Sequence, residues 1–337
     1  MKQYITRYLL LVAVLFSTSS LWARESYTLN RDWKFFTYSE NYSSIVNLPH
    51  QWNSDALSGR LDYYRGTGNY LRYVDFRPEW KGKRIYLRFG GANLVTDLII
   101  NGRYVGRHEG GSSAFTFEIT DFVNFNGKDL IWVIVGNVSQ SEVMPTAGNE
   151  ISYGGLFRGV QIIIEEPTHI ALDHFSTDGV YIHNKKIGAE VASGEVEVRV
   201  SALAAQSASL TLSVTNPHGE EVFTATQKVR TTKGTTATFI PFEIDNPTLW
   251  HGTLNPALYT FNITLSTAGA ACDNVGVQTG FRHYEITTEG FVLNGEKYPI
   301  KGVLYAATGH STAQPYRSVK CLKMWSLRSK WEPTQSA

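Results

Sequence analysis

Hydrophobic residues beyond position 60 recur in short runs that either alternate with polar residues or form brief β-branched blocks. Glycine, asparagine and aspartate separate these runs, as is typical of turns between strands. No long stretch has the 3.6-residue period of an amphipathic helix. The pattern predicts an antiparallel β-sandwich over residues 26–167. Its clearest strand candidates are 69–76, 83–89, 96–102, 114–120, 130–136 and 160–166.

A second group of runs follows and predicts a second sandwich. About seven short strands in roughly 115 residues are typical of an immunoglobulin-like domain, which we expect over residues 168–281. The region lacks the cysteine pair and central tryptophan of antibody domains, so only the sandwich architecture is predicted. The strand candidates are 194–203, 208–216, 221–229, 236–244, 257–266 and 275–281.

Composition supports a folded, all-β chain. Of 337 residues, 42% are hydrophobic, 13% aromatic and 18% charged, which is enough apolar material for two cores. The formal net charge is +1, and no long basic or acidic block occurs. We therefore expect no nucleic acid partner and no binding to an anionic membrane surface.

The amino terminus has the form of a bacterial export signal. Lys2 and Arg7 precede the apolar run "YLLLVAVLF", and "STSSLWA" offers a small-residue cleavage site after about Ala23. We expect residues 1–23 to be removed and the remaining chain to be periplasmic or secreted, without a membrane anchor. Its only cysteines, Cys272 and Cys321, are far apart, which argues against a disulfide scaffold.

Several stretches together resemble glycoside hydrolase family 2, which includes β-galactosidases, β-glucuronidases and β-mannosidases. The resemblance implies a jelly-roll sugar-binding domain at 26–167, an immunoglobulin-like domain at 168–281, and a lead-in at 282–303 to a catalytic TIM barrel. Their order and spacing make the resemblance specific up to Val303. The stretches are "VNLPHQWN", "RGTGNYLRYVDF", "DLIINGRYVGRHEGGSSAFTFEITDFV", "GGLFRGVQI", "NPTLWHGTLNPALYTF" and "GFRHYEITTEGFVLNGEKYPIKGV".

The barrel itself is missing from this sequence. A TIM barrel takes about 200 residues or more, whereas 34 residues follow Val303. The family is retaining, and retaining glycosidases need two carboxyl groups roughly 5 Å apart. Family members supply both as barrel glutamates, whereas the tail here has one acidic residue, Glu332. We therefore expect no catalytic residue in this chain and no hydrolysis by it.

Residues 304–337 do not continue the family pattern. The codons that can encode "KWEPTQSA" can also be read in a shifted frame, in which each new codon starts at the third base of an old one. In that frame they can encode "VGTNAIR", which resembles a barrel segment of the family. We therefore hypothesise that one base was lost after the codon for Val303. The segment would then be a disordered, out-of-frame tail.

Three residues are candidate sugar contacts. In family members, a loop before the Gly-Gly-aromatic-Arg motif reaches the barrel mouth, and spacing places Asn149 there with Glu150 beside it. Arg65 lies in another loop that can approach the pocket. The alternative is that all three are solvated loop or surface residues. Glu150 is not expected to be catalytic, because the family's acid/base glutamate lies on a barrel strand.

Other residues have plainer interpretations. His50 is expected to make a structural hydrogen bond, since no second metal ligand follows at suitable spacing, and Arg158 to close the sandwich. We expect no metal and no cofactor. Aromatic residues that could stack on a sugar, or simply pack in the core, are Trp33, Trp52, Tyr63, Tyr64, Tyr70 and Trp80. Asn-X-Ser/Thr sites at Asn41, Asn137 and Asn262 occur easily by chance.

Three functions remain open. The first is the amino-terminal part of a β-galactosidase-like family 2 enzyme that cleaves O-glycosidic bonds in carbohydrate metabolism, with a β-galactoside-like glycan as its partner. The second is a free-standing carbohydrate-binding module. The third is a structural or interaction protein. The lead-in at 282–303 favours the first, because a binding module needs no approach to a barrel.

Overall fold

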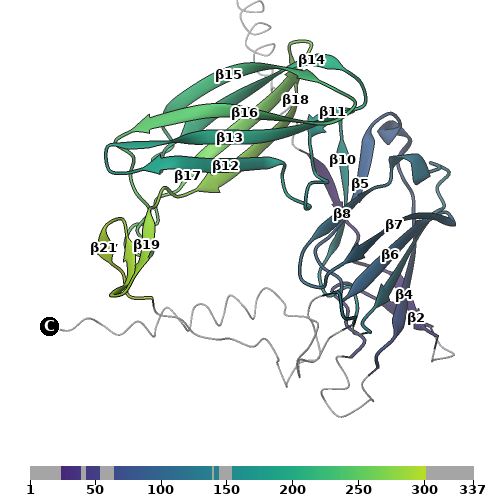
Figure 1. Cartoon of the computed structure of the whole chain (residues 1–337). Coiled ribbons are helices and arrows are strands. Elements are labelled where there is room, and N and C mark those ends of the chain that lie inside the picture. Colours follow the sequence, from purple (N-terminus) through teal and green to yellow (C-terminus); the bar gives the residue numbers. More distant parts are fainter. Residues whose placement is uncertain (1–23, 39–42, 54–63, 139, 144–153, 301–337) are drawn as a thin grey trace, which may run out of the picture. The chain divides into compact units, whose positions relative to one another are not determined.

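The computed structural model describes residues 24–38, 43–53, 64–138, 140–143 and 154–300, and Figure 1 shows their strands. The chain divides into two compact units. The first sandwich contains the described residues of 25–167 together with 171–179. The second contains 168–170 and 180–281. The predicted signal peptide and the predicted tail at 304–337 lie outside the described residues.

The first sandwich consists of a four-stranded and a six-stranded antiparallel sheet. Two short 3-10 helices, Pro78–Trp80 and Thr120–Phe122, connect strands. The four-stranded sheet has the order β1 (Glu25–Thr28), β10 (Val160–Glu165), β5 (Arg84–Phe89) and β8 (Phe115–Glu118). The six-stranded sheet has the order β3 (Ser43–Val46), β2 (Trp33–Thr37), β4 (Thr67–Val74), β9 (Asp129–Gly136), β6 (Val95–Ile100) and β7 (Arg103–Glu109).

Alternation along the strands builds the core between these sheets. In β9, Ile131, Val133 and Val135 are fully buried, whereas the residues between them are only partly buried. Successive side chains of a strand point to opposite faces, so an almost wholly apolar run still has one core face. Residues of both sheets meet in one hydrophobic cluster that includes Leu87 of β5 and Leu98 of β6.

The outer face of the four-stranded sheet is covered by residues 171–179 of the same unit. Leu172 packs on Tyr86 and Ile163, and the Arg88 side chain donates to Ser176 through Nε and Nη2, both at 3.2 Å. This segment therefore continues the first sandwich after the chain has passed through the short strand β11 (Thr168–Ile170).

The second sandwich has eight strands, where about seven were predicted. Neither β11 (Thr168–Ile170) nor β12 (Val180–Ile187) was among the strand candidates, and β11 pairs with one end of β13 (Val191–Ala202). One sheet contains β11, β12 (Val180–Ile187), β13 (Val191–Ala202) and β16 (Gly234–Asp245). The other has the order β15 (Glu221–Thr231), β14 (Gln206–Thr215), β17 (Tyr259–Thr267) and β18 (Ala270–Thr279).

Strand β16 illustrates how local chemistry selects a position in the sheet. Its exposure alternates strictly over the second half, with Ile240, Phe242 and Ile244 in the core. Pro241 lies between them and has no N–H to donate, so it suits a strand that pairs on one side only. Among the described strands, β16 pairs only with β13.

A small three-stranded sheet follows the second sandwich. It contains β19 (Tyr284–Thr287), β20 (Gly290–Leu293) and β21 (Glu296–Lys297). Asn294 and Gly295 both have positive φ angles, 51° and 86°, as a two-residue hairpin turn requires. A two-residue Asn-Gly hairpin therefore lies within the predicted lead-in.

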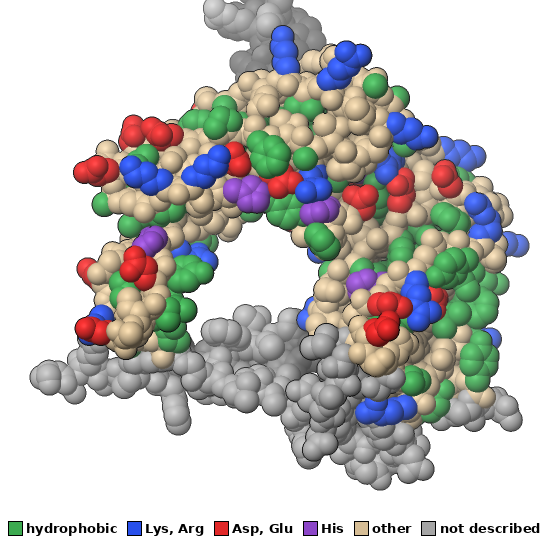
Figure 2. Space-filling model, in the orientation of Figure 1, with side chains coloured by type: hydrophobic (Ala, Val, Ile, Leu, Met, Phe, Trp, Pro, Cys, Tyr) green, Lys and Arg blue, Asp and Glu red, His purple; other side chains and the backbone are tan. Residues whose placement is uncertain are grey.

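The described chain is all-β, which confirms the predicted fold class, and its described residues contain no TIM barrel. On the face shown in Figure 2, side chains of both charge signs are interspersed over each sandwich. Within the described ranges, no helix has the length and hydrophobicity needed to span a bilayer.

Candidate functional site

The best-defined site lies in the first sandwich, at the described residues that flank the ranges 54–63 and 144–153. We call the residues that hold these flanking segments the loop-base cluster. Strand β2 also ends here, and its last residue, Thr37, pairs with Gly68 near the start of β4. The cluster consists of Phe35, His50, Trp52, Asn53, Tyr64, Gly68, Tyr70, Asn137 and Gly154.

Trp52 is the centre of the loop-base cluster. Its indole ring fits between two glycines: a Cβ on Gly154 would lie 1.9 Å from the ring, and one on Gly68 would lie 2.4 Å from it. Phe35 stacks on Trp52 with ring centroids 5.9 Å apart and planes 18° apart. Only glycine permits this close approach of backbone to ring, so Trp52 joins the end of one loop to a central strand.

Two asparagine side chains fix residues 64–66. Asn53 accepts from the Tyr64 amide and donates to the Tyr64 carbonyl oxygen, each at 2.9 Å. Asn137 donates to the same oxygen at 3.2 Å and accepts from the Gly66 amide at 2.8 Å. Asn53 and Asn137 are 1% and 0% exposed, so these bonds are made away from water.

The carboxyl-terminal end of the 144–153 loop is held by backbone pairing. The Trp52 amide donates to the Gly154 carbonyl at 3.2 Å, and the His50 amide donates to the Leu156 carbonyl at 2.8 Å. Gly155 forms an isolated bridge with Asn93. At the other end of the loop, Val143 is buried in a cluster with Leu94 and Val95. Both ends of the loop are therefore anchored to the sandwich.

His50 makes the structural hydrogen bond predicted for it. Its Nδ1 lies 2.7 Å from the Tyr70 hydroxyl, which also accepts from the Leu156 amide at 3.4 Å. Tyr70 is fully buried, and burial raises the pKa of its hydroxyl above the ordinary range. The hydroxyl therefore keeps its proton and can donate it to His50.

The three predicted site residues have different outcomes. Arg65 is exposed and lies between Tyr64 and Gly66, whose backbone groups the asparagines hold. Asn149 and Glu150 fall in residues 144–153, outside the described chain. The structure thus places Arg65 beside the cluster that contains Gly154, the first described residue after 144–153, and the sugar-contact roles of all three residues stay predictions.

The candidate aromatics divide by burial. Trp33, Tyr70 and Trp80 are buried in the core, Trp52 and Tyr64 are partly buried in the loop-base cluster, and Tyr63 lies outside the described residues. The sequence alone showed no sign of the structural roles of Asn53 and Asn137. Asn137 was visible only as a chance glycosylation site, and the structure shows its amide buried and bonded to backbone.

The side chains of the loop-base cluster are suited to binding a ligand and not to catalysing a reaction. Its described members supply amides and aromatic rings, with the exposed Arg65 beside them, but no carboxylate that could act as acid, base or nucleophile. Over the described parts of the chain, no three His, Cys, Asp or Glu side chains are grouped as a metal site. Arg158 is structural, as predicted, because Nη1 donates to the carbonyls of Gly90 at 3.1 Å and Ser112 at 3.0 Å.

Comparison with protein families matches both sandwiches. The model described as "Glycosyl hydrolases family 2, sugar binding domain" matches residues 19–167, and that described as "Glycosyl hydrolases family 2" matches residues 178–282. Among curated proteins, the chain is 37% identical to a β-glucuronidase of Bacteroides fragilis, over 87% of this chain and 43% of the relative. It is 26% identical to a β-galactosidase of Thermoanaerobacter pseudethanolicus, over 83% of this chain and 38% of the relative.

Solved structures agree with the sequence relatives. The crystal structure of a Bacteroides uniformis β-glucuronidase has a TM-score of 0.82 at 28% identity and covers 91% of this chain and 38% of that one. The chain thus spans about two fifths of the length of the relatives it matches, and it corresponds to their amino-terminal part. The chain belongs to glycoside hydrolase family 2.

Proposed function

We propose that this chain is the sugar-recognition part of a family 2 β-glycosidase whose substrates are β-galactosides or β-glucuronides. The observation that carries the proposal is the loop-base cluster, which holds the backbone on both sides of Arg65, and also Gly154, the first described residue after 144–153, against the first sandwich. Binding groups held by packed neighbours lose little freedom when a ligand binds, so they suit recognition. Relatives named β-glucuronidase and β-galactosidase support these two sugar classes, the β-glucuronidase at the higher identity.

Within this proposal, Arg65 donates to sugar hydroxyl or carboxylate oxygens, and Asn149 and Glu150 orient sugar hydroxyls from the loop. The family's retaining mechanism needs a pair of carboxyl groups about 5 Å apart, which the family resemblance places on the barrel. The two sandwiches alone would bind sugar without lowering the barrier to hydrolysis.

Calorimetric titration of the full chain with methyl β-galactoside and methyl β-glucuronide tests recognition. Arg65→Ala should weaken binding of at least one of the two by roughly tenfold, because it removes a charge-assisted hydrogen bond. Asn149→Ala should weaken binding several-fold. Arg31→Ala is the matched control, since Arg31 is also exposed but lies before the opposite end of β2. Equal affinity of the Arg65 and Arg31 variants would refute the proposed site.

A hydrolysis assay tests the catalytic part of the proposal. The full chain should release no nitrophenol above background from nitrophenyl β-galactoside, β-glucuronide or β-mannoside. Glu150→Gln should be indistinguishable from the unmodified chain. Turnover that disappears in Glu150→Gln would show that the first sandwich is itself catalytic.

We also propose that the chain is exported to the periplasm or secreted, because residues 1–23 have the form of a signal peptide. Expression of the full chain in a Gram-negative host should yield periplasmic protein that begins near Arg24. Amino-terminal sequencing of the fractionated protein checks this, and intact Met1 in cytoplasmic protein would contradict it.

A further inference from the structure

The outer face of the β15–β14–β17–β18 sheet in the second sandwich is largely polar, and several of its side chains pair across strands. Thr211 and Thr226 lie 3.1 Å apart through their hydroxyls. Asn274 donates to Thr264 at 2.8 Å, and Gln278 donates to Thr260 at 3.4 Å. The side chains within each of these cross-strand pairs satisfy one another.

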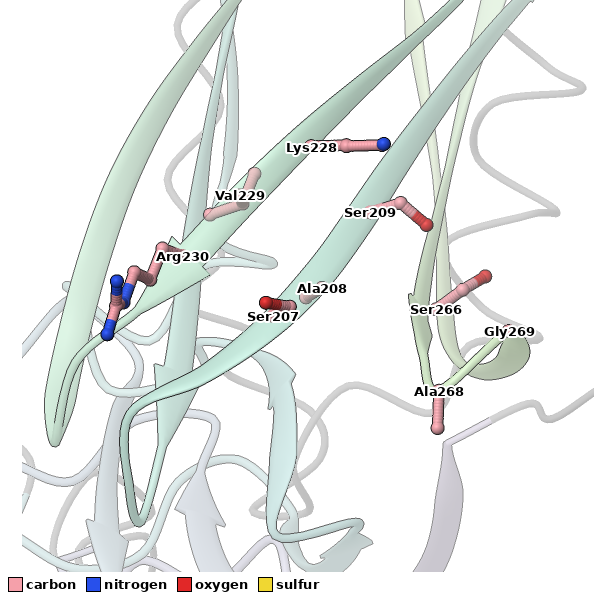
Figure 3. A pocket seen from close by; sticks show the side chains of 9 residues that line it. All are labelled: Ser207, Ala208, Ser209, Lys228, Val229, Arg230, Ser266, Ala268 and Gly269. Carbon is pink, nitrogen blue, oxygen red and sulfur yellow. The ribbon is translucent and has the colours of Figure 1, made fainter.

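One end of this face is different. It forms a pocket with a volume of about 550 Å³, which we call the basic pocket (Figure 3). Ser209 lies opposite Lys228 on β15 and Ser266 on β17, and Ser207 lies opposite Arg230. These registers are equivalent to those of the paired threonines. Yet none of the five side chains makes a hydrogen bond or ion pair with another described residue.

The lining of the basic pocket has a one-sided charge. Lys228 and Arg230 are both cationic, and its described lining contains no aspartate or glutamate. The two residues are two positions apart on one face of β15, so their Cα atoms are about 7 Å apart. In Figure 3 the Lys228 side chain extends toward β14 and Ser209, whereas the Arg230 side chain extends to the other side of β15, and the turn at Ala268 and Gly269 lies across β14 from them. Two cations and three hydroxyl-bearing side chains therefore line the basic pocket.

We propose that the basic pocket binds the anionic group of an acidic glycan, either a uronic acid carboxylate or a sulfate ester. A guanidinium and an ammonium group form charge-assisted hydrogen bonds to either anion. Serine hydroxyls can both donate to and accept from neighbouring sugar hydroxyls. The volume lies within the range of small-ligand sites, roughly 300–1,000 Å³. A glycan is favoured because the chain belongs to a family of glycosidases. This site is separate from the loop-base cluster and does not depend on the proposed function.

Titration of the full chain with defined oligosaccharides tests the proposal. A hyaluronan oligosaccharide carries carboxylates only, a sulfated galactan oligosaccharide carries sulfates only, and a neutral galactan oligosaccharide carries neither. At least one acidic ligand should bind, more weakly as salt is raised, and the neutral ligand should bind at least about tenfold more weakly. Binding of only one acidic ligand identifies which anion the pocket takes.

The variant Lys228→Gln/Arg230→Gln should weaken acidic-ligand binding by about tenfold or more. The control Lys34→Gln/Lys186→Gln removes the same charge from exposed positions outside the pocket and should leave binding unchanged. Ser209→Ala should have a smaller, several-fold effect. Thermal unfolding of each variant verifies that it is folded.

Four results would overturn the proposal: no acidic ligand binds, the neutral ligand binds equally well, the two charge variants lose affinity equally, or the pocket variant keeps full affinity. Equal binding of a single-stranded DNA oligomer would show general anion attraction and would also overturn the assignment to glycan.

Discussion

The loop-base cluster of the first sandwich and the basic pocket of the second are both polar regions at the end of a sheet, but they use their polar groups in opposite ways. In the loop-base cluster, Asn53 and Asn137 use their amides on backbone atoms of residues 64–66. In the basic pocket, Lys228, Arg230 and their serine neighbours bond to no described side chain. Internal bonds give a region rigidity, whereas unpaired groups leave it available to a ligand. Mutations in the loop-base cluster should therefore mainly lower the free energy of unfolding, whereas mutations in the basic pocket should mainly lower ligand affinity.

The largest stability effect is expected at Trp52. Trp52→Ala removes the ring that fills the space between Gly68 and Gly154, and should lower the free energy of unfolding by about 2–4 kcal/mol. Tyr73→Ala is the control, because it truncates an aromatic that is 70% exposed and should cost less than about 0.5 kcal/mol. Urea denaturation measures both. Equal stability of the two variants would mean that the loop-base cluster is not a packing centre.

Asn53→Ala should have the next largest effect, about 1–3 kcal/mol, because it leaves the Tyr64 amide without its buried acceptor. The same denaturation experiment measures it. Asn126→Ala makes a suitable comparison, since Asn126 is exposed and accepts a single bond from the Lys128 amide. A loss no greater than that of Asn126→Ala would show that residues 64–66 are held by other contacts.

A pH-dependent effect is expected from a third polar group, on the outer face of β13. Burial opposes ionisation of Glu197, but hydrogen bonds from His183 at 3.0 Å and Arg199 at 2.7 Å outweigh it and hold the pKa of Glu197 below its usual value. A carboxyl group whose pKa is lowered by folding stabilises the folded state above its unfolded pKa, about 4.3. That contribution is lost as the pH falls through the folded value.

Glu197→Gln should therefore be less stable than the unmodified chain at pH 6, and the difference should shrink below about pH 4. Unfolding midpoints measured from pH 3 to pH 7 follow this change. Glu243→Gln, which alters a carboxyl group for which no such bonds are described, should show little pH-dependent difference. A gap for Glu197→Gln that stays constant with pH would exclude ionisation as its cause.

The smallest stability effect is expected in the basic pocket. Lys228→Gln/Arg230→Gln should change the free energy of unfolding by less than about 0.5 kcal/mol, because neither cation has a described partner to lose. Losses comparable to those of Trp52→Ala would show that these cations hold the sheet together, and the contrast between the two regions would disappear.

Much of the architecture followed from local pattern. Runs such as 130–136 and 208–216 were recognised as strands because residue type and period determine which side chains can form a core face. The Asn-Gly turn at 294–295 was also predictable, since few residue pairs accept positive φ at both positions. Among the strands missed, β1 and β3 have only four residues each and β11 has three, so their periods are too brief to detect. The eight-residue β12 was missed because its sequence, VYIHNKKI, has four successive polar residues and does not alternate.

The sequence by itself determined the all-β class, the family and the structural role of His50, because these depend on local composition, motif order and spacing. The tertiary structure decided what Asn137 does and where Arg65 lies, since their neighbours are more than ten positions away in the chain. It also decided the contrast on β14, where Thr211 is paired and Ser209 is not. Strand register and cross-strand geometry determine which polar groups meet, and neither can be read from the residues in order.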